Sequence, residues 1–216
     1  MQYEPPSMQA CPHCGGAYFV MDLFASNTFG STLYSDGYRQ DPDMSMDTGV
    51  MPCCHCGKPF FREDMVRLLR HYEDKNTDPR YKDNPAFQDL PAFFGTLDPQ
   101  VLFPLATQEA DHERRRRLHV FTMWGDNHTE TTRSTEEKQE NLRQLLDHLN
   151  AESRGDTCMG ADALRQLGRF DACIARLAPL LADPSAQDFH PAARLIQGAA
   201  RAGNREVFVV RTALED

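Results

Sequence analysis

The pattern of apolar and polar positions divides the chain into a strand-forming first third and a helical remainder. Runs of β-forming residues cover 17–24, 28–35 and 58–62, with turn residues between them. These runs predict three short strands of one small sheet. From residue 63 onward, apolar positions instead recur three and four residues apart, as one face of a helix requires. We therefore expect an α+β protein.

The helical remainder begins with a predicted helix over 63–72, because the acidic pair Glu63-Asp64 suits a helix N-terminus. The proline-rich stretch 74–104 predicts short helical turns that pack against their neighbours. Residues 206–212 fit either a strand or a last helix. Stronger helical patterns cover 109–128, 135–149, 161–183 with a turn at Gly168, and 191–202.

Two short stretches carry the clearest chemistry: Cys11-Pro12-His13-Cys14-Gly15 and Cys53-Cys54-His55-Cys56-Gly57. Each places two residues between two cysteines and a glycine directly after the second cysteine. A tight turn of this kind presents both thiolates to one ion, and the glycine lets backbone amides point at sulfur. Four thiolates satisfy a tetrahedral Zn²⁺ completely. We predict one structural zinc ion held by Cys11, Cys14, Cys53 and Cys56.

The competing interpretation of these cysteines is a pair of local disulfides. The start of the chain shows neither the basic residues nor the apolar stretch of a secretion signal, so we expect a cytoplasmic protein with reduced thiols. Cys54 offers an alternative ligand to Cys53, but the two-residue spacing favours Cys53. Four cysteines leave no open coordination position, which predicts a structural rather than a catalytic metal.

Composition and charge restrict the partners. The chain has 216 residues, 40% hydrophobic and 25% charged, and is typical of a globular protein. It contains no apolar run of the roughly eighteen residues that a membrane helix needs. The net charge is −9, and residues 63–112 hold ten acidic against five basic side chains. Nucleic-acid binders normally carry the opposite sign on their docking face. We therefore expect a protein partner, and neither nucleic acid nor membrane.

On the strength of both cysteine pairs, residues 11–61 resemble the zinc-ribbon superfamily. Three further segments resemble a group of uncharacterised bacterial zinc-ribbon proteins in which a similar hairpin precedes a helical region. These segments are Ser26-Asn27-Thr28-Phe29-Gly30, Tyr34-Ser35-Asp36-Gly37 and Trp124-Gly125-Asp126-Asn127. The resemblance implies a small three-stranded zinc ribbon followed by helices, and it brings no established activity.

Residues 160–184 resemble one tetratricopeptide repeat. Gly168 and Phe170 match its turn glycine and the following aromatic residue, while Cys173 stands where alanine is usual. Gly168 and Gly203 lie 35 residues apart, close to the repeat length of about 34. The resemblances imply a zinc ribbon over 1–62, a helical middle region packed on it over 63–152, and a tetratricopeptide-like region over 153–216.

Several other residues invite a functional interpretation. Glu109 and His112 have the spacing of a di-iron helix, but no second copy exists, so we expect an ordinary helix start. Arg114 to Arg117 point all round a helix, which favours salt bridges with the acidic segment 63–112 over phosphate binding. The aromatic residues Phe29, Tyr34, Tyr38 and Trp124, with polar Asn27, Asp36 and Asn127, predict either a recognition surface or, as we favour, a packed seam between ribbon and helices.

The sequence thus favours a cytoplasmic protein–protein interaction module with structural zinc, of undetermined oligomeric state. A nucleic-acid-associated zinc-ribbon protein is the first alternative. The second is an enzyme whose site lies between ribbon and helices and uses some of His112, His119, Asp126 and His128. Convergence of these four residues in one polar pocket would favour the enzyme.

Overall fold

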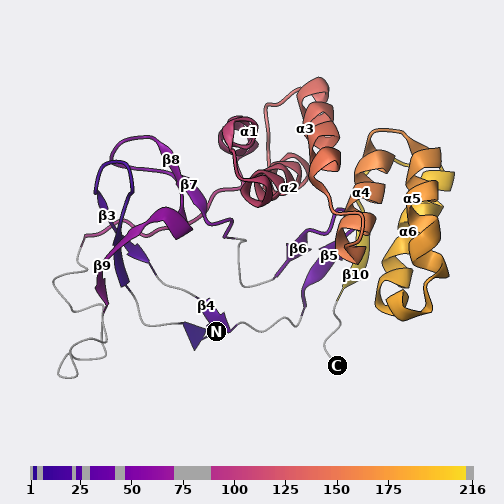
Figure 1. Ribbon diagram of the computed structural model, residues 1–216, viewed down its shortest axis with the longest axis horizontal. Coiled ribbons are helices and arrows are strands. Elements are labelled where there is room, and N and C mark those ends of the chain that lie inside the picture. The colour runs from indigo at the N-terminus through magenta and orange to yellow at the C-terminus, as the bar shows by residue number, and fades with distance from the viewer. Residues whose placement is uncertain are drawn as a thin grey trace. The chain divides into compact units, whose positions relative to one another are not determined.

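The protein is a mixed α and β structure, with small antiparallel sheets near the N-terminus and six helices after them (Figure 1). The computed structural model describes residues 2–3, 7–20, 23–25, 30–41, 47–70 and 89–212. The chain forms two compact units. Unit 1 comprises Met1–Asn27 and Met46–Thr96, and unit 2 comprises Thr28–Ser45 and Leu97–Asp216. The chain therefore leaves unit 1 after residue 27 and returns to it at residue 46.

Unit 1 is built on two β-hairpins. Strand β2 (Ser7–Ala10) pairs with β3 (Ala17–Val20), and β7 (Val50–Pro52) pairs with β8 (Pro59–Phe61), both antiparallel. Strand β1 (Gln2–Tyr3) pairs with β4 (Leu23–Ala25). The run 17–24 thus contributes to two strands rather than one, and the predicted strand over 58–62 is confirmed as β8.

The predicted helix over 63–72 is wrong throughout its described part. After a 3₁₀ turn at Arg62–Asp64, strand β9 (Val66–Arg70) pairs antiparallel with β2. Residues 71 and 72 lie outside the described residues. The apolar residues of this segment suit a strand as well as a helix, and β2 offers an edge of unpaired backbone groups. Pairing with that edge outweighs a weak helical preference.

Residues 89–98 also differ from the expected short helical turns, because none of them is helical. Residues 89–96 belong to unit 1, where the backbone of Phe19 bonds Pro91 and Phe93 and forms a parallel bridge to Ala92. Phe93 is buried there. It completes a core whose other buried members are Cys11, Tyr18, Val20, Cys53 and Phe60. The remaining residues of the predicted segment before 89 lie outside the described residues.

The helices of unit 2 confirm the patterns predicted beyond residue 109. Asp98, Asp111, Ser134 and Ser153 cap four of them by accepting backbone N–H groups. Such caps satisfy amides that have no partner within the helix. The six helices are α1 (Pro99–Gln108), α2 (His112–His128), α3 (Thr135–His148), α4 (Arg154–Gln166), α5 (Phe170–Ala182) and α6 (His190–Arg201).

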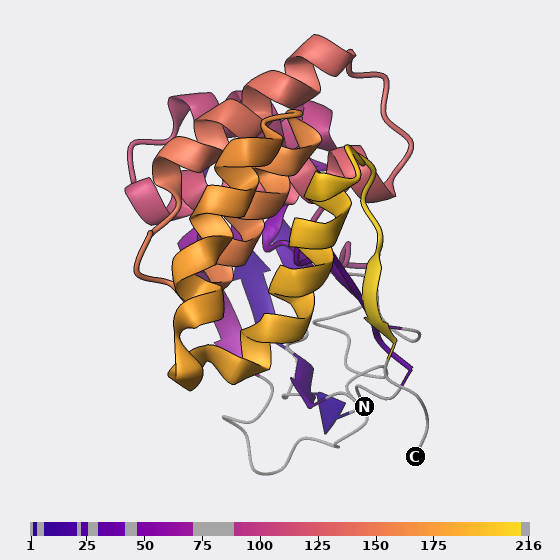
Figure 2. The same cartoon turned by 90° about the vertical axis from the view of Figure 1, so that its right-hand side faces the viewer.

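A further sheet belongs to unit 2, and it corrects the predicted three-stranded ribbon. Strand β5 (Thr32–Tyr34) lies between β6 (Arg39–Gln40) and β10 (Val209–Thr212). The run 28–35 therefore does not pair with the strands beside the cysteines, although it lies between them in sequence. Strand β10, which runs beside α6 in Figure 2, also shows that the end of 206–212 is a strand.

The turns at Gly168 and Gly203 are equivalent. Both glycines have a left-handed φ, 76° and 69°, and in both the glycine N–H bonds the carbonyl three residues back. In both, the following N–H bonds the carbonyl five residues back. The segments that follow the two turns differ. Helix α5 begins at Phe170 after the first turn, whereas the chain after Gly203 leads into β10. The β-branched residues of β10 and the edge of β5 favour the strand there.

Candidate metal centre

The four predicted cysteines lie on two equivalent loops, 11–16 and 53–58, each at the tip of a hairpin. The N–H of Cys11 bonds the carbonyl of Gly16 at 2.8 Å, and the N–H of Cys53 bonds that of Lys58 at 2.9 Å. Gly15 and Gly57 have φ values of 74° and 73°, in the left-handed region that glycine adopts without strain. Each glycine N–H bonds the carbonyl of the first cysteine of its own loop. The two loops therefore have the same conformation because they share the cysteine spacing and the glycine that follows it.

The two tips bring four sulfur atoms together. The Sγ atoms of Cys11, Cys14, Cys53 and Cys56 all lie within 4.8 Å of one another. The Sγ atoms of Cys14 and Cys53 are 3.7 Å apart, and Cys54 is not a member of the group. The backbone N–H of residue 13 donates to the sulfur of Cys11 at 3.4 Å, and that of residue 55 donates to Cys53 at the same distance. These four cysteines could hold a metal ion.

The histidine in each loop joins the two hairpins. His13 Nε2 lies 3.2 Å from the carbonyl oxygen of Pro59, and His55 Nε2 lies 3.3 Å from that of Ala17. A carbonyl can only accept, so Nε2 carries the proton and donates in both. Each histidine thus reaches the first residue of the strand that leaves the opposite loop. In both loops the histidine lies two residues after the first cysteine, and the carbonyl that it bonds lies six residues after the first cysteine of the other loop. This equal spacing is a signal in the sequence for the contact.

Tyr18 is a further contributor that sequence reasoning missed, since it counted only as a strand former. Its side chain is fully buried, and its hydroxyl lies 3.2 Å from both Cys53 Sγ and Cys54 Sγ. The same oxygen accepts the backbone N–H of Cys54 at 2.8 Å. Burial and the neighbouring sulfurs raise the pKa of Tyr18, so the hydroxyl keeps its proton as a donor. No sequence motif marks this contact.

Without a bound cation, the thiols of Cys53 and Cys14 have very different pKa values. Burial opposes ionisation of Cys53, but hydrogen bonds from Tyr18 and from backbone N–H groups lower its pKa to about 6. The N–H of Gly16 lowers the pKa of Cys14, but desolvation and three neighbouring sulfurs raise it to about 12. The cluster therefore holds protons that a cation would displace, as metal binding to thiolates requires.

In unit 2, the segments 34–37 and 124–127 meet around Asp36, whose side chain is fully buried. Its carboxylate accepts from Asn127 Nδ2 at 2.8 Å and from His128 Nε2 at 2.9 Å. Trp124 donates its indole N–H to the backbone oxygen of Asp36, and the ring of Tyr38 stacks on His128 at 4.1 Å. These residues form a packed seam between the β5–β6 hairpin and α2, within unit 2. Asn27 and Phe29 lie outside the described residues.

A second buried contact in unit 2 centres on Arg165 of α4, which is fully buried. Its guanidinium donates twice to Asp162 Oδ1, at 2.9 and 2.7 Å. Nη1 donates to the backbone oxygens of Asn204 and Glu206, and Nη2 donates to Ser35 Oγ. One side chain therefore binds α4 to the hairpin and to the segment that leads into β10.

The four residues of the enzyme hypothesis do not form one site. The His119 ring stacks on that of His148, and burial lowers the pKa of His119. Asp126 pairs with Arg133 at 2.5 Å, and burial raises the pKa of Asp126 to about 6. His128 contacts Asp36, and His112 is exposed at the start of α2. His112 and His119 therefore share His148 as a neighbour, whereas Asp126 and His128 each contact other residues.

One arginine of the run at the start of α2 makes ion pairs with carboxylates outside the expected segment. Arg116 pairs with Glu113 at 2.7 Å and with Asp156 at 3.2 Å, and both carboxylates lie outside 63–112. Arg115 donates to the backbone oxygen of Glu109, which does lie in that segment. Glu109 itself accepts the N–H of Asp111 before the helix begins.

None of the helices in the described part of the chain is both long and apolar enough to cross a membrane. Comparisons of the chain with protein families, with curated proteins and with solved structures found no match. Fold and site together define a mixed α and β protein with a four-cysteine cluster that could hold a metal ion.

Proposed function

We propose that the protein is a cytoplasmic protein–protein interaction module whose first unit is a zinc ribbon stabilised by one structural Zn²⁺. The observation that carries the proposal is the gathering of four cysteine sulfurs from two equivalent hairpin tips. Four thiolates suit Zn²⁺ in tetrahedral geometry and leave no coordination position for a substrate or a water. Bound there, the ion would supply folding free energy and no chemistry.

The size of unit 1 supports a structural role for the metal. Its two cysteine-bearing hairpins have strands of only three or four residues, and the buried cluster that its described residues form around them is small. Sheets this small rarely bury enough apolar surface to be stable alone, and a metal ion is one common remedy. Two hairpins joined at their tips by four thiolates are the arrangement that a zinc ribbon uses.

The helical unit supports the interaction role. The α4–α5 hairpin, the following α6 and the equivalent turns at Gly168 and Gly203 are the features expected of a tetratricopeptide-like region. The net charge of −9 disfavours nucleic acid as the partner. The candidate catalytic residues of α2 do not all converge on one site, because His128 contacts Asp36 whereas His112 and His119 contact His148. A protein partner is therefore the class of ligand that we favour.

Metal analysis of serine variants tests the zinc site. We expect one zinc per chain in the wild-type protein, and loss of that zinc with unfolding of unit 1 in Cys14→Ser or Cys56→Ser, because three thiolates leave the ion open to water and chelators. Cys54→Ser is the matched control and should retain the metal. Retention of one tightly bound zinc in either of the first two variants would overturn the ligand assignment.

Affinity capture from native cells tests the interaction role. The full chain should retain a specific protein partner after nuclease treatment, and it should show no binding to DNA or RNA at about 50 mM salt. Repeated captures that return no specific partner would contradict the proposal. Nucleic-acid binding with a steep salt dependence would instead favour a nucleic-acid-associated role.

A further inference from the structure

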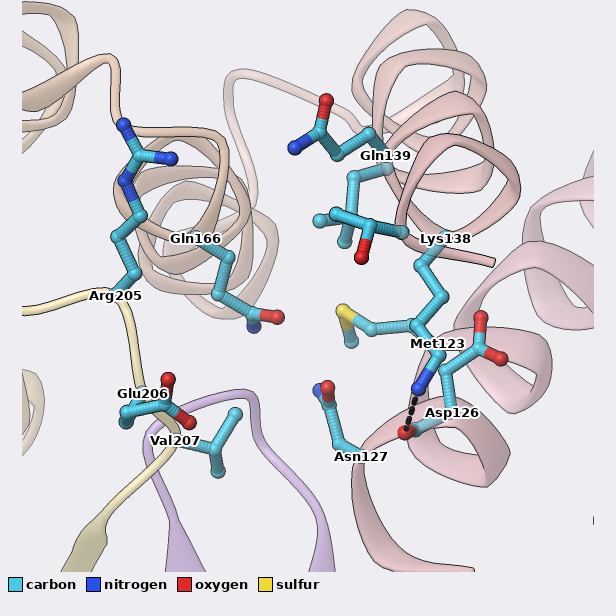
Figure 3. Close-up of a pocket in the computed structure, with 11 residues that line it drawn as sticks. Met123, Asp126, Asn127, Lys138, Gln139, Gln166, Arg205, Glu206 and Val207 are labelled. Atoms are coloured by element: carbon cyan, nitrogen blue, oxygen red, sulfur yellow. Dashed lines mark hydrogen bonds between the residues drawn. The ribbon is translucent and has the colours of Figure 1, made fainter. Parts of the chain in front are cut away.

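Unit 2 contains a cavity of about 400 Å³ that the metal site does not involve (Figure 3). Residues of α2 and α3 form one wall, and Gln166 at the end of α4 faces them. The segment 205–207, which leads into β10, forms another side. The cavity therefore borders the segment in which the chain leaves α6 and continues into β10. Its volume falls within the range of about 300–1,000 Å³ typical of ligand sites.

Three carboxamide side chains from three helices point toward the space in Figure 3: Asn127, Gln139 and Gln166. Asn127 uses its amide nitrogen on Asp36, and Gln166 uses its own on Asp162. Their carbonyl oxygens have no partner among the described residues. The oxygen of Gln139 accepts from Arg143, which leaves its NH₂ group to donate. The cavity thus presents acceptors and a donor together.

Most of the other residues that line the cavity are either apolar or charged, and the charges of the charged residues cancel. Met123 and Leu142 are buried, and Val207 lies half-buried beside them. The cations are already engaged: Lys138 donates to the backbone oxygen of Asp126, and Arg205 lies over the ring of Phe170. Two basic and two acidic residues line the cavity, so it offers no net charge to a phosphate or a carboxylate.

Val207 adds backbone groups to the same wall. Its neighbour Phe208 bonds Ser35 through both its N–H and its carbonyl group. Within the described parts of the chain, neither the N–H nor the C=O of Val207 has a hydrogen-bond partner. A segment with unpaired backbone groups beside a cavity is suited to pair with an extended chain.

We propose that this cavity binds an extended, uncharged peptide segment of a partner protein. One aliphatic side chain would pack on Met123, Leu142 and Val207, while its backbone bonds the carboxamides and the main chain of Val207. Peptide groups match this lining because each offers one donor and one acceptor. The inference rests on the proposed interaction role and names the class of partner at one site in unit 2.

Nuclear magnetic resonance of the ¹⁵N-labelled full chain tests the inference, with acetyl-Gly-Leu-Gly-amide as the probe. We expect saturable shift changes at the Val207 N–H and the Gln139 side-chain NH₂, with Kd on the order of 1 mM for so short a ligand. Free leucine and acetyl-Gly-Asp-Gly-amide should bind at least about tenfold more weakly, because each brings uncompensated charge into the cavity.

A pair of glutamine variants on α3 provides the matched comparison. Gln139→Ala should weaken peptide binding about fivefold, the usual effect of one hydrogen bond. Gln144→Ala should leave it unchanged, because that side chain bonds Glu140 and does not line the cavity. Neither variant removes a buried group, so both should fold.

Three results would overturn the inference: no shift changes at these groups, equal binding of free leucine, or an unchanged Kd in Gln139→Ala. The interaction role would survive any of them if a captured partner binds wild type and Gln139→Ala equally, because the partner would then use another surface. Failure to capture any partner would count against the interaction role itself, whatever the peptide result.

Discussion

The two units reach stability by different routes. In unit 1, two short loops of identical spacing bring four sulfurs within 4.8 Å, and the loop geometry is set by neighbouring residues in sequence. In unit 2, the buried guanidinium of Arg165 bonds residues that are far from it in the chain, including Ser35 and Asn204. The comparison teaches that local chemistry can be inferred from spacing, whereas long-range polar contacts depend on how the whole unit packs.

The largest expected effect is that removal of the metal destabilises unit 1 and leaves unit 2 folded. Chelation of zinc should remove on the order of 10 kcal/mol of stabilisation from unit 1, the usual scale for structural zinc. Hydrogen exchange should then show loss of protection at Tyr18 and Phe60, with Leu145 and Ile196 still protected. Loss of protection in both units at the same chelator concentration would show that their stabilities are not independent.

The second effect concerns the buried arginine of unit 2. Arg165→Met should lower the free energy of unfolding by about 3–5 kcal/mol, because Asp162 is left as an unpaired buried carboxylate. Urea unfolding followed by helical circular dichroism measures this. Arg143→Met, at an exposed ion pair, should change the free energy of unfolding by less than about 1 kcal/mol. Equal effects of the two variants would refute the special role of the buried pair.

A smaller effect is expected at a close helix contact in unit 2. A Cβ atom on Gly125 would lie 2.1 Å from the backbone oxygen of Leu97, so Gly125→Ala should cost about 1–3 kcal/mol. Gly198→Ala is the control, since nothing lies within 4 Å of its added Cβ. It should stabilise α6 by about 0.5–1 kcal/mol, as alanine does in a helix. Thermal unfolding distinguishes the two signs.

The smallest effect tests whether unit 1 depends on local spacing alone. Tyr18→Phe removes the hydroxyl between Cys53 and Cys54, and should weaken zinc binding about tenfold while leaving the metal site intact. Tyr34→Phe, whose hydroxyl bonds Gln40 on the surface, should leave zinc affinity unchanged. Competition with a chromophoric chelator measures both. An unchanged affinity in Tyr18→Phe would mean that the loops suffice without it.

The sequence predicted the helices beyond residue 109 and the gathering of four cysteines, because both depend on periodicity or spacing within a few residues. It did not predict that Pro99–Gln108 forms one helix. It failed at Val66–Arg70, where the same apolar residues satisfy a helical and a strand pattern and the edge of β2 decided the outcome. It also wrongly placed the run 28–35 in the ribbon. The run belongs to unit 2, where its strand β5 pairs with Arg39–Gln40 and Val209–Thr212. Strand partners are non-local, so no local pattern names them.

By itself, the sequence determined which cysteines can meet, because a two-residue spacing followed by glycine dictates each loop tip. It also predicted the helix start after Ser134 and the turn at Gly168, whereas α4 begins at Arg154 rather than at the predicted residue 161. Only the tertiary structure decided that Tyr18 reaches Cys53 and that the hairpin between the two cysteine pairs packs on the helices of unit 2. These contacts form because buried polar groups must find partners, and which partners they find depends on the fold as a whole.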